Sequence, residues 1–210
     1  GLARACSNNP KTEHTDRLIL EGLFTTVTNV SFHDETLRQM IQQVNKEKSE
    51  VVPGCAACTS PCSNTDNYDI EQLWKAPEDI RSLKSLILFG IRGMAAYAYH
   101  AMILGYRDSR INEFLYKALS VLAEDRNEEE LFPVVLETGE VNLICMELLD
   151  RANRETFGKP EPTKVSLTVE KGPFIVVTGH DLYDLKLLLE QTEGKGINIY
   201  THGEMLPAHG

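Results

Sequence analysis

Two side chains that can bind a metal ion or move a proton follow two predicted strands near the end of the sequence. His180 comes after the apolar, β-branched run 173–178, and Glu204 comes after the alternating run 197–201. Neighbouring strands lie about 4.8 Å apart, so an imidazole and a carboxylate placed there can meet at one atom. The pair predicts a metal site or an acid–base pair; two unrelated loop residues are the alternative.

A predicted strand–helix–strand unit positions these two residues. Asp181 stands where a helix N-cap is expected, and Gly194 and Gly196 end the helix. Its apolar residues recur at helical spacing: Leu182, Leu185, Leu188 and Leu189. A crossover of this length joins parallel strands, whose carboxyl ends meet at the edge of the sheet where ligands bind. We expect the first strand to be buried and a polar loop to follow the second.

The sequence before residue 158 has the apolar periodicity of helices. We expect a short helix within 18–27 and a helix capped by Asp34. A long helix should start at Pro77 and end at Gly105, with further helices in 111–122 and 131–152. The last three are amphipathic and joined by short loops, which predicts an antiparallel bundle.

The long helix carries a predicted packing face. Its members are Leu83, Ile87, Gly90, Met94, Tyr97 and Ala101. Gly90 and Gly93 indicate a close approach of another helix. Arg92 and His100 interrupt the apolar run 83–104, so we interpret it as a buried helix rather than a membrane span.

These elements predict a multidomain α and α/β protein, with a helical bundle domain followed by the start of a Rossmann-like parallel α/β domain. Segment 1–50 is expected to be the remainder of a first helical bundle, and 51–76 a linker with a cysteine-rich loop. Segment 77–157 should form a second three-helix bundle, and 164–210 should start the α/β domain and carry the candidate ligands. We expect the sequence to be an internal part of a longer protein.

Three of the five cysteines lie close together in the predicted linker. Cys55, Cys58 and Cys62 have a C-x2-C-x3-C spacing that suits part of an iron–sulfur cluster or a zinc site. No fourth cysteine is near, so we favour free thiols in a loop. Cys145 lies on an apolar helix face and is interpreted as a small core residue.

Charge and composition limit the partners. The formal net charge is −10, which argues against a nucleic-acid backbone or an anionic membrane as the main partner. No basic segment followed by an apolar core is seen at the start. An odd number of cysteines then favours a reducing, cytoplasmic setting.

Three stretches of the sequence resemble the hybrid-cluster protein family, also called prismane proteins or hydroxylamine reductases. They are VVTGHDLYDLKLLLEQTEGKGINIYTHGEMLPAHG (176–210), FTTVTNVSF (24–32) and GIRGMAAYAYHAMILG (90–105). The resemblance implies a helical domain of two three-helix bundles followed by two α/β domains. It also implies a [4Fe–4S] cluster near the N-terminus of the full-length protein and a hybrid iron–sulfur–oxygen cluster between its domains.

The resemblance also implies roles for the two candidate residues. The histidine of the GHDL motif and the glutamate of THGEMLPAH bind the hybrid cluster in the family, which implies His180 and Glu204 as iron ligands and catalytic residues. The remaining family ligands lie outside this sequence, and Cys55, Cys58 and Cys62 match none of them. The chain itself is therefore expected to hold no cluster and to be inactive alone. The implied substrate is hydroxylamine, reduced to ammonia, or nitric oxide, with electrons from a redox partner protein and a role in nitrosative stress.

Two alternatives remain open at the sequence level. The first is a zinc-dependent enzyme that uses His180, Glu204 and either His202 or His209. The second is a non-catalytic helical interaction module with a vestigial α/β tail.

Overall fold

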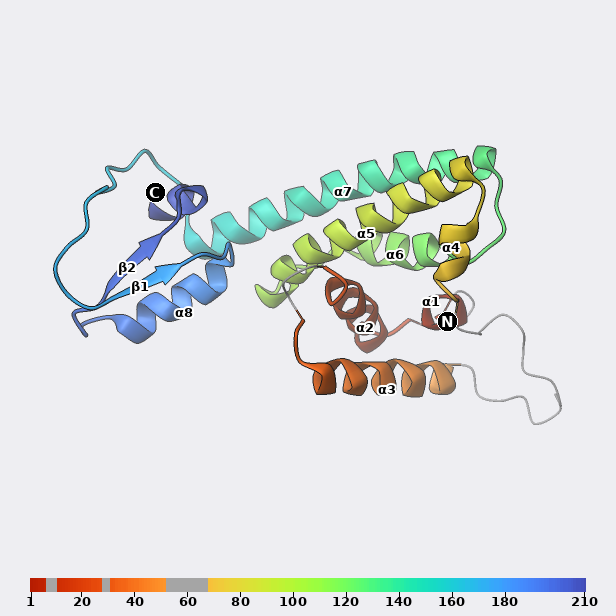
Figure 1. Cartoon of the computed structure of the whole chain (residues 1–210), viewed down its shortest axis with the longest axis horizontal. Coiled ribbons are helices and arrows are strands. Elements are labelled where there is room, and N and C mark those ends of the chain that lie inside the picture. Colours follow the sequence, from red (N-terminus) through yellow and green to blue (C-terminus); the bar gives the residue numbers. More distant parts are fainter. Residues whose placement is uncertain (7–10, 28–30, 52–67) are drawn as a thin grey trace. The chain divides into compact units, whose positions relative to one another are not determined.

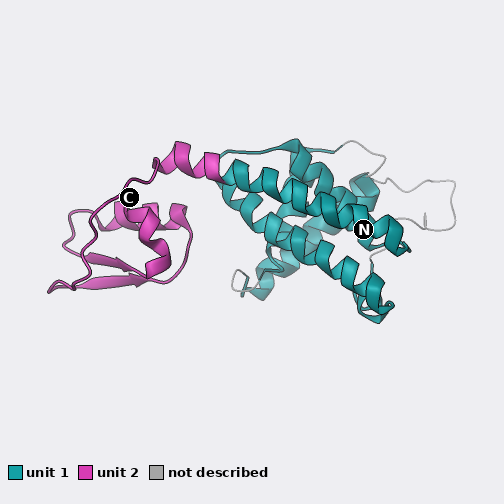
Figure 2. Ribbon diagram, turned by 90° about the horizontal axis from the view of Figure 1, so that it is seen from above, with its two compact units in different colours: residues 1–149 teal, residues 150–210 magenta. Residues whose placement is uncertain are grey.

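The computed structural model describes residues 1–6, 11–27, 31–51 and 68–210, and Figure 1 traces them along the sequence. The chain divides into two compact units, Gly1–Leu149 and Asp150–Gly210, drawn in teal and magenta in Figure 2. The first unit is helical, and the second contains a small parallel sheet. The predicted order of a helical part followed by the start of an α/β part is therefore seen. The Rossmann-like character and the division into four segments stay predictions.

The helical unit contains the predicted helices, with some shifts at their ends. Its elements are α1 (Leu2–Ala5), α2 (Glu13–Phe24), α3 (Asp34–Val51), α4 (Glu71–Lys75), α5 (Glu78–Ile103), α6 (Ser109–Leu122) and the start of α7 (Glu128–Phe157). Helix α2 begins earlier than predicted because Thr12 and Thr15 form a reciprocal capping box. Asp34 is the first residue of α3, and the His33 ring accepts the Thr36 N–H in the capping position.

Helices α5 and α6 run in opposite directions, as predicted for a bundle with short loops (Figure 1). Lys84, near the start of α5, donates from Nζ to the carbonyls of Leu122 and Glu124 at the end of α6, at 3.1 and 2.7 Å. The lysine thus satisfies carbonyls that have no partner within the helix. Sequence periodicity did not identify Lys84, which is 6% exposed and whose pKa is lowered by burial.

Helices α5 and α7 run in the same direction and approach closely. A Cβ built on Gly90 would lie 2.5 Å from Thr138 Cγ2, and the Cys145 thiol donates to the Met94 carbonyl at 3.5 Å. The predicted close approach at Gly90 is confirmed. The same prediction for Gly93 is wrong, because a Cβ there would meet nothing within 4 Å.

The predicted apolar faces of α6 and α7 are largely buried, and that of α5 needs one correction. The α5 core residues are Ile87, Ile91, Met94, Ala95, Ala98 and Ala101. Tyr97 was predicted to belong to this face but is 41% exposed. One residue along a helix turns the side chain by about 100°, so the neighbouring Ala98 occupies the core instead.

Helix α5 is also the one described helix that is long and apolar enough to cross a membrane by length and composition. The core helix of a helical bundle passes the same test. Helix α5 contacts α2 and the residues that follow it: Phe24 stacks on Tyr99 with ring centroids 4.3 Å apart, and Thr26 accepts a hydrogen bond from Arg92 at 2.9 Å.

The segment predicted as a linker contains a short helix. In α4, Leu73 is fully buried and Trp74 lies 6.4 Å from the Phe89 ring. Cys55, Cys58 and Cys62 lie outside the described residues, so the prediction of free thiols in a loop stays a prediction.

The α/β unit has the predicted strand–helix–strand order. Strands β1 (Phe174–Val177) and β2 (Asn198–Thr201) pair in parallel, and α8 (Leu182–Thr192) connects them (Figure 1). Asp181 caps α8 by accepting the Asp184 N–H at 3.0 Å, as predicted.

Two predictions for this unit are wrong. Strand β1 is not buried: Phe174 and Val176 are 61% and 58% exposed, because two strands and one helix cannot cover both faces of a sheet. The polar loop predicted after β2 is a 3-10 helix, η2 (Gly203–His209), with His202 as its N-cap.

Replacing Gly90 with Ala should destabilise the helical unit by about 1–3 kcal/mol, because the new methyl group overlaps Thr138 Cγ2. Thr138 cannot turn away freely, since its hydroxyl donates to the Val134 carbonyl at 2.7 Å. Chemical denaturation followed by circular dichroism measures the change.

The matched control is Gly93→Ala on the same helix, where a Cβ meets nothing. This variant should be more stable by about 0.5–1 kcal/mol, the helix-interior advantage of Ala over Gly. Thr138→Ser removes Cγ2 and should restore most of the loss in Gly90→Ala. Equal effects of the two glycine replacements would contradict the close approach.

Cys145 should resist alkylation by iodoacetamide at about pH 8 in the folded chain and react once the chain is unfolded. Its side chain is fully buried, and burial raises the pKa of the thiol to about 12, so almost no thiolate forms. Mass spectrometry of peptides after timed labelling checks this. Labelling of Cys145 at the rate seen in denaturant would contradict the bundle core.

Candidate metal centre

The register of the two strands brings the candidate ligands to equivalent positions. Val177 pairs with Thr201 as the last residues of β1 and β2. His180 follows Val177 by three residues, and Glu204 follows Thr201 by three residues. Both residues therefore lie at equivalent positions beyond the ends of neighbouring strands, close enough for their side chains to meet.

The two side chains meet directly. His180 Nε2 lies 2.5 Å from Glu204 Oε2. A carboxylate can only accept, so His180 Nε2 carries the proton and donates it. The convergence predicted from strand topology is confirmed, although nothing in this geometry by itself assigns a role to either residue.

His202 completes a group of three potential metal ligands. One ligand atom each from His180, His202 and Glu204 lie within 4.8 Å of one another, and His180 and Glu204 are exposed. His209, named with His202 as an alternative zinc ligand, is not in this group: its Nε2 lies 2.8 Å from the Thr201 hydroxyl. An imidazole–carboxylate set of this kind suits borderline metal ions such as iron or zinc.

The contact with His180 changes the acidity of Glu204. The hydrogen bond from His180 lowers the pKa of the Glu204 carboxyl, and the charges of His180 and His202 add to this effect. The pair is open to solvent, with side-chain exposures of 62% and 75%. Exposed pairs of this kind contribute little to stability.

A cavity of about 710 Å³ lies beside the pair within the Asp150–Gly210 unit. His180 and Glu204 line it together with apolar residues of α8 and η2, among them Leu185 and Met205. Its size falls in the range of pockets that hold cofactors and small ligands, about 300–1,000 Å³. The sequence did not predict this cavity, because its walls come from segments that meet only in the folded unit.

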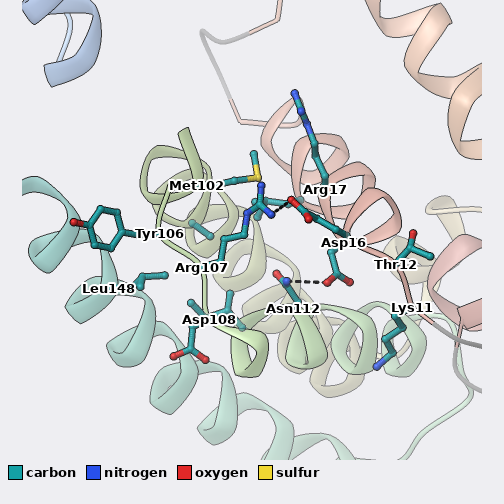
Figure 3. A pocket seen from close by; sticks show the side chains of 14 residues that line it. Lys11, Thr12, Asp16, Arg17, Met102, Tyr106, Arg107, Asp108, Asn112 and Leu148 are labelled. Atoms are coloured by element: carbon teal, nitrogen blue, oxygen red, sulfur yellow. Dashed lines mark hydrogen bonds and ion pairs between the residues drawn. The ribbon is translucent and has the colours of Figure 1, made fainter. Parts of the chain in front are cut away.

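A second, smaller pocket lies in the helical unit and has a different character (Figure 3). It encloses about 170 Å³. Asn112 of α6 donates to Asp16 of α2 at 3.1 Å, and Arg107 pairs with Glu13. These polar groups join α2 to α6 and to the loop that precedes α6, and the pocket is below the usual size of a ligand site.

Comparison with known proteins places the whole sequence in one group. A family model described as "Prismane/CO dehydrogenase family" matches residues 1–210.

Similar relatives carry a common name. A "Hydroxylamine reductase" of Thermoanaerobacter pseudethanolicus is 44% identical over 214 residues, covering 94% of this chain and 39% of the relative. Proteins of the same name from Methanococcus vannielii and Maridesulfovibrio salexigens are 41% and 43% identical, over 92% and 93% of this chain. The chain thus spans about 39% of the length of the relatives it matches.

The pKa of Glu204 should be higher in His180→Ala than in the unaltered chain, because the variant removes the hydrogen bond and the charge that lower it. The stability that the contact contributes is present above the ordinary carboxyl pKa of 4.5 and is lost as the pH falls through the lowered value. NMR titration that follows the Glu204 carboxyl carbon measures this pKa in the variant and in the unaltered chain.

His33→Ala is the control for this measurement, since it removes an exposed histidine of the helical unit. It should leave the Glu204 titration unchanged. The same Glu204 pKa in His180→Ala and the unaltered chain would contradict the direct contact.

Proposed function

Because this chain belongs to the Prismane/CO dehydrogenase family, we propose that it supplies two iron ligands, His180 and Glu204, to the hybrid iron–sulfur–oxygen cluster of an oxidoreductase. The proposed reaction is reduction of hydroxylamine to ammonia, with nitric oxide as the other candidate substrate. The name that the relatives share supports the reaction class. Electrons come from a redox partner protein through a [4Fe–4S] cluster elsewhere in the full-length protein.

The observation that carries the proposal is the contact between His180 Nε2 and Glu204 Oε2, 2.5 Å long, at adjacent parallel strand ends. Sequence motif and strand geometry select the same two residues by independent arguments. Ligands in open α/β sheets bind at this edge, outside the carboxyl ends of the strands.

The donor set fits an iron centre of mixed ligation. When bound, the cluster supplies electrons and an iron at which a small nitrogen–oxygen substrate is reduced. His180 and Glu204 are harder donors than thiolates, which suits an iron that must also accept a substrate. His180 would hold iron through a deprotonated imidazole nitrogen, and Glu204 would contribute a negative charge beside it.

The surroundings of the pair also fit. The adjoining cavity of about 710 Å³ is far larger than hydroxylamine needs and offers space for a multi-iron group. Two donors cannot fix such a group alone. The proposal therefore requires further ligands from outside the described residues, as the resemblance to the longer relatives implies.

The proposal also includes a cytoplasmic location and a role in nitrosative stress. It includes no nucleic-acid or membrane partner. The net charge of −10 supports the last point, because anionic polymers and anionic lipid surfaces repel such a chain.

A mononuclear zinc site is the second candidate, favoured by the grouping of His180, His202 and Glu204 within 4.8 Å. Three protein ligands and one open position are the usual composition of a catalytic zinc site. Elemental analysis separates the two candidates, since zinc without sulfide supports this one and iron with sulfide supports the first.

Replacing His180 with Ala or Glu204 with Gln in the full-length protein should each lower iron and sulfide content and hydroxylamine reduction. Changes in residues that only support a metal ligand cost about 10–100-fold in affinity or activity, so loss of a ligand should cost at least as much. Protein purified without oxygen is assayed for iron, acid-labile sulfide and turnover.

Glu170→Gln is the control for the glutamate variant, because Glu170 is an exposed carboxylate of the same unit outside the cavity lining. His33→Ala is the control for the histidine variant, because His33 is an exposed histidine of the helical unit. Iron and sulfide contents near those of the unaltered protein in either ligand variant would remove that residue from the centre.

A further inference from the structure

His202 occupies a central place between the two loops that carry the proposed ligands. It is the residue directly after β2 and the N-cap of η2. Across the strand pair it faces Gly179, the residue directly before His180. A side chain in this position can hold one loop against the other.

The hydrogen bonds of His202 define a single tautomer. The Glu204 N–H donates to His202 Nδ1 at 3.3 Å, so Nδ1 carries no proton. The proton of the neutral ring then lies on Nε2, which is 3.4 Å from the Gly179 carbonyl and donates to it. Both ring nitrogens therefore contact the backbone, and the one available lone pair, on Nδ1, accepts the Glu204 N–H.

The ring of His202 also limits the position of His180. The two imidazoles meet edge to face, with centroids 4.8 Å apart and an interplanar angle of 75°. Each hydrogen bond of His202 is long, so each is weak alone. Together the three contacts connect the loop of His180, the ring of His180 and the backbone of Glu204.

We propose that His202 is a positioning residue that holds His180 and Glu204 in convergence, rather than a third metal ligand. The inference rests on the proposed function, in which His180 and Glu204 bind iron. It predicts that the arrangement of the metal-binding pair depends on a residue that never contacts the metal.

Two substitutions separate the two contacts of the ring. His202→Asn keeps an acceptor near the position of Nδ1 and retains the cap on Glu204, whereas His202→Gln keeps a donor near the position of Nε2 and retains the contact with Gly179. His202→Ala removes both. His33→Ala is the matched control, because His33 is also a histidine that caps a helix through Nδ1 but lies in the helical unit.

The probe is cobalt(II) alone, added to the 210-residue chain without oxygen and followed by calorimetry and visible absorbance. We expect His202→Ala to weaken cobalt binding by about 10–100-fold, with smaller losses in the Asn and Gln variants and none in His33→Ala. Far-UV circular dichroism confirms that each variant is folded.

A second measurement tests the ligand question directly. Long-range ¹H–¹⁵N spectra of the histidine rings, recorded with and without zinc(II), report which nitrogen carries a proton. We expect His202 to keep its proton on Nε2 in both spectra, while His180 loses the Nε2 proton when zinc binds.

The outcomes distinguish the two levels of inference. Cobalt affinity within twofold of the unaltered chain in His202→Ala, or loss of the His202 Nε2 proton on zinc binding, overturns the positioning role. Unchanged affinity in His180→Ala and Glu204→Gln, with an effect of His202→Ala, overturns the proposed ligand pair instead. If the unaltered chain binds no cobalt, the spectra of the metal-free chain decide: a proton on His202 Nδ1 instead of Nε2 overturns the positioning role, and a proton on Nε2 supports it.

Discussion

The in-register parallel pairing of β1 and β2 is the constraint on which the candidate centre depends. Val177 and Thr201 end the strands opposite one another, and each ligand follows at the same distance along the chain. A shift of one residue in register would move one side chain by about 3.3 Å and turn the strand's side chains to the other face. Helix α8 connects the two strands, and Gly194 and Gly196, which have positive φ, turn the chain from α8 into β2. This crossover determines where β2 begins and therefore where Glu204 lies.

How much of this could be read from the sequence depends on the range of the interactions. Helix positions and the parallel crossover follow from local periodicity, capping and length, and these predictions succeeded. Three features of α5 depend on which neighbour packs on each face of the helix: the burial of Lys84, the exposure of Tyr97 and the open space around Gly93. Periodicity predicts the buried face of a helix only to within one residue. The exposure of β1 was missed because a β-branched run indicates a strand and says nothing of what covers it.

The site itself shows the same division. The meeting of His180 and Glu204 was predicted because a strand–helix–strand crossover of this length places the ends of its two strands side by side. The cavity beside them was not predicted, since its walls come from α8, η2 and residues 150–160, which meet only in the folded unit. His202 was noticed only as a possible ligand, and its two hydrogen bonds to the backbone, which depend on the folded loops, could not be foreseen.

The engagement of His202 bears on the choice between iron–sulfur and zinc chemistry. A catalytic zinc site usually takes three protein ligands, and the cluster His180, His202 and Glu204 would supply them only if a His202 nitrogen left its backbone partner. Breaking the bond to Gly179 or the cap on Glu204 would loosen the loops that bring the other two donors together. A centre that takes only His180 and Glu204 from this unit, with its other ligands from outside the described residues, leaves every one of these contacts intact. The hydrogen bonds of His202 are therefore compatible with the proposed centre, in which this unit supplies only His180 and Glu204.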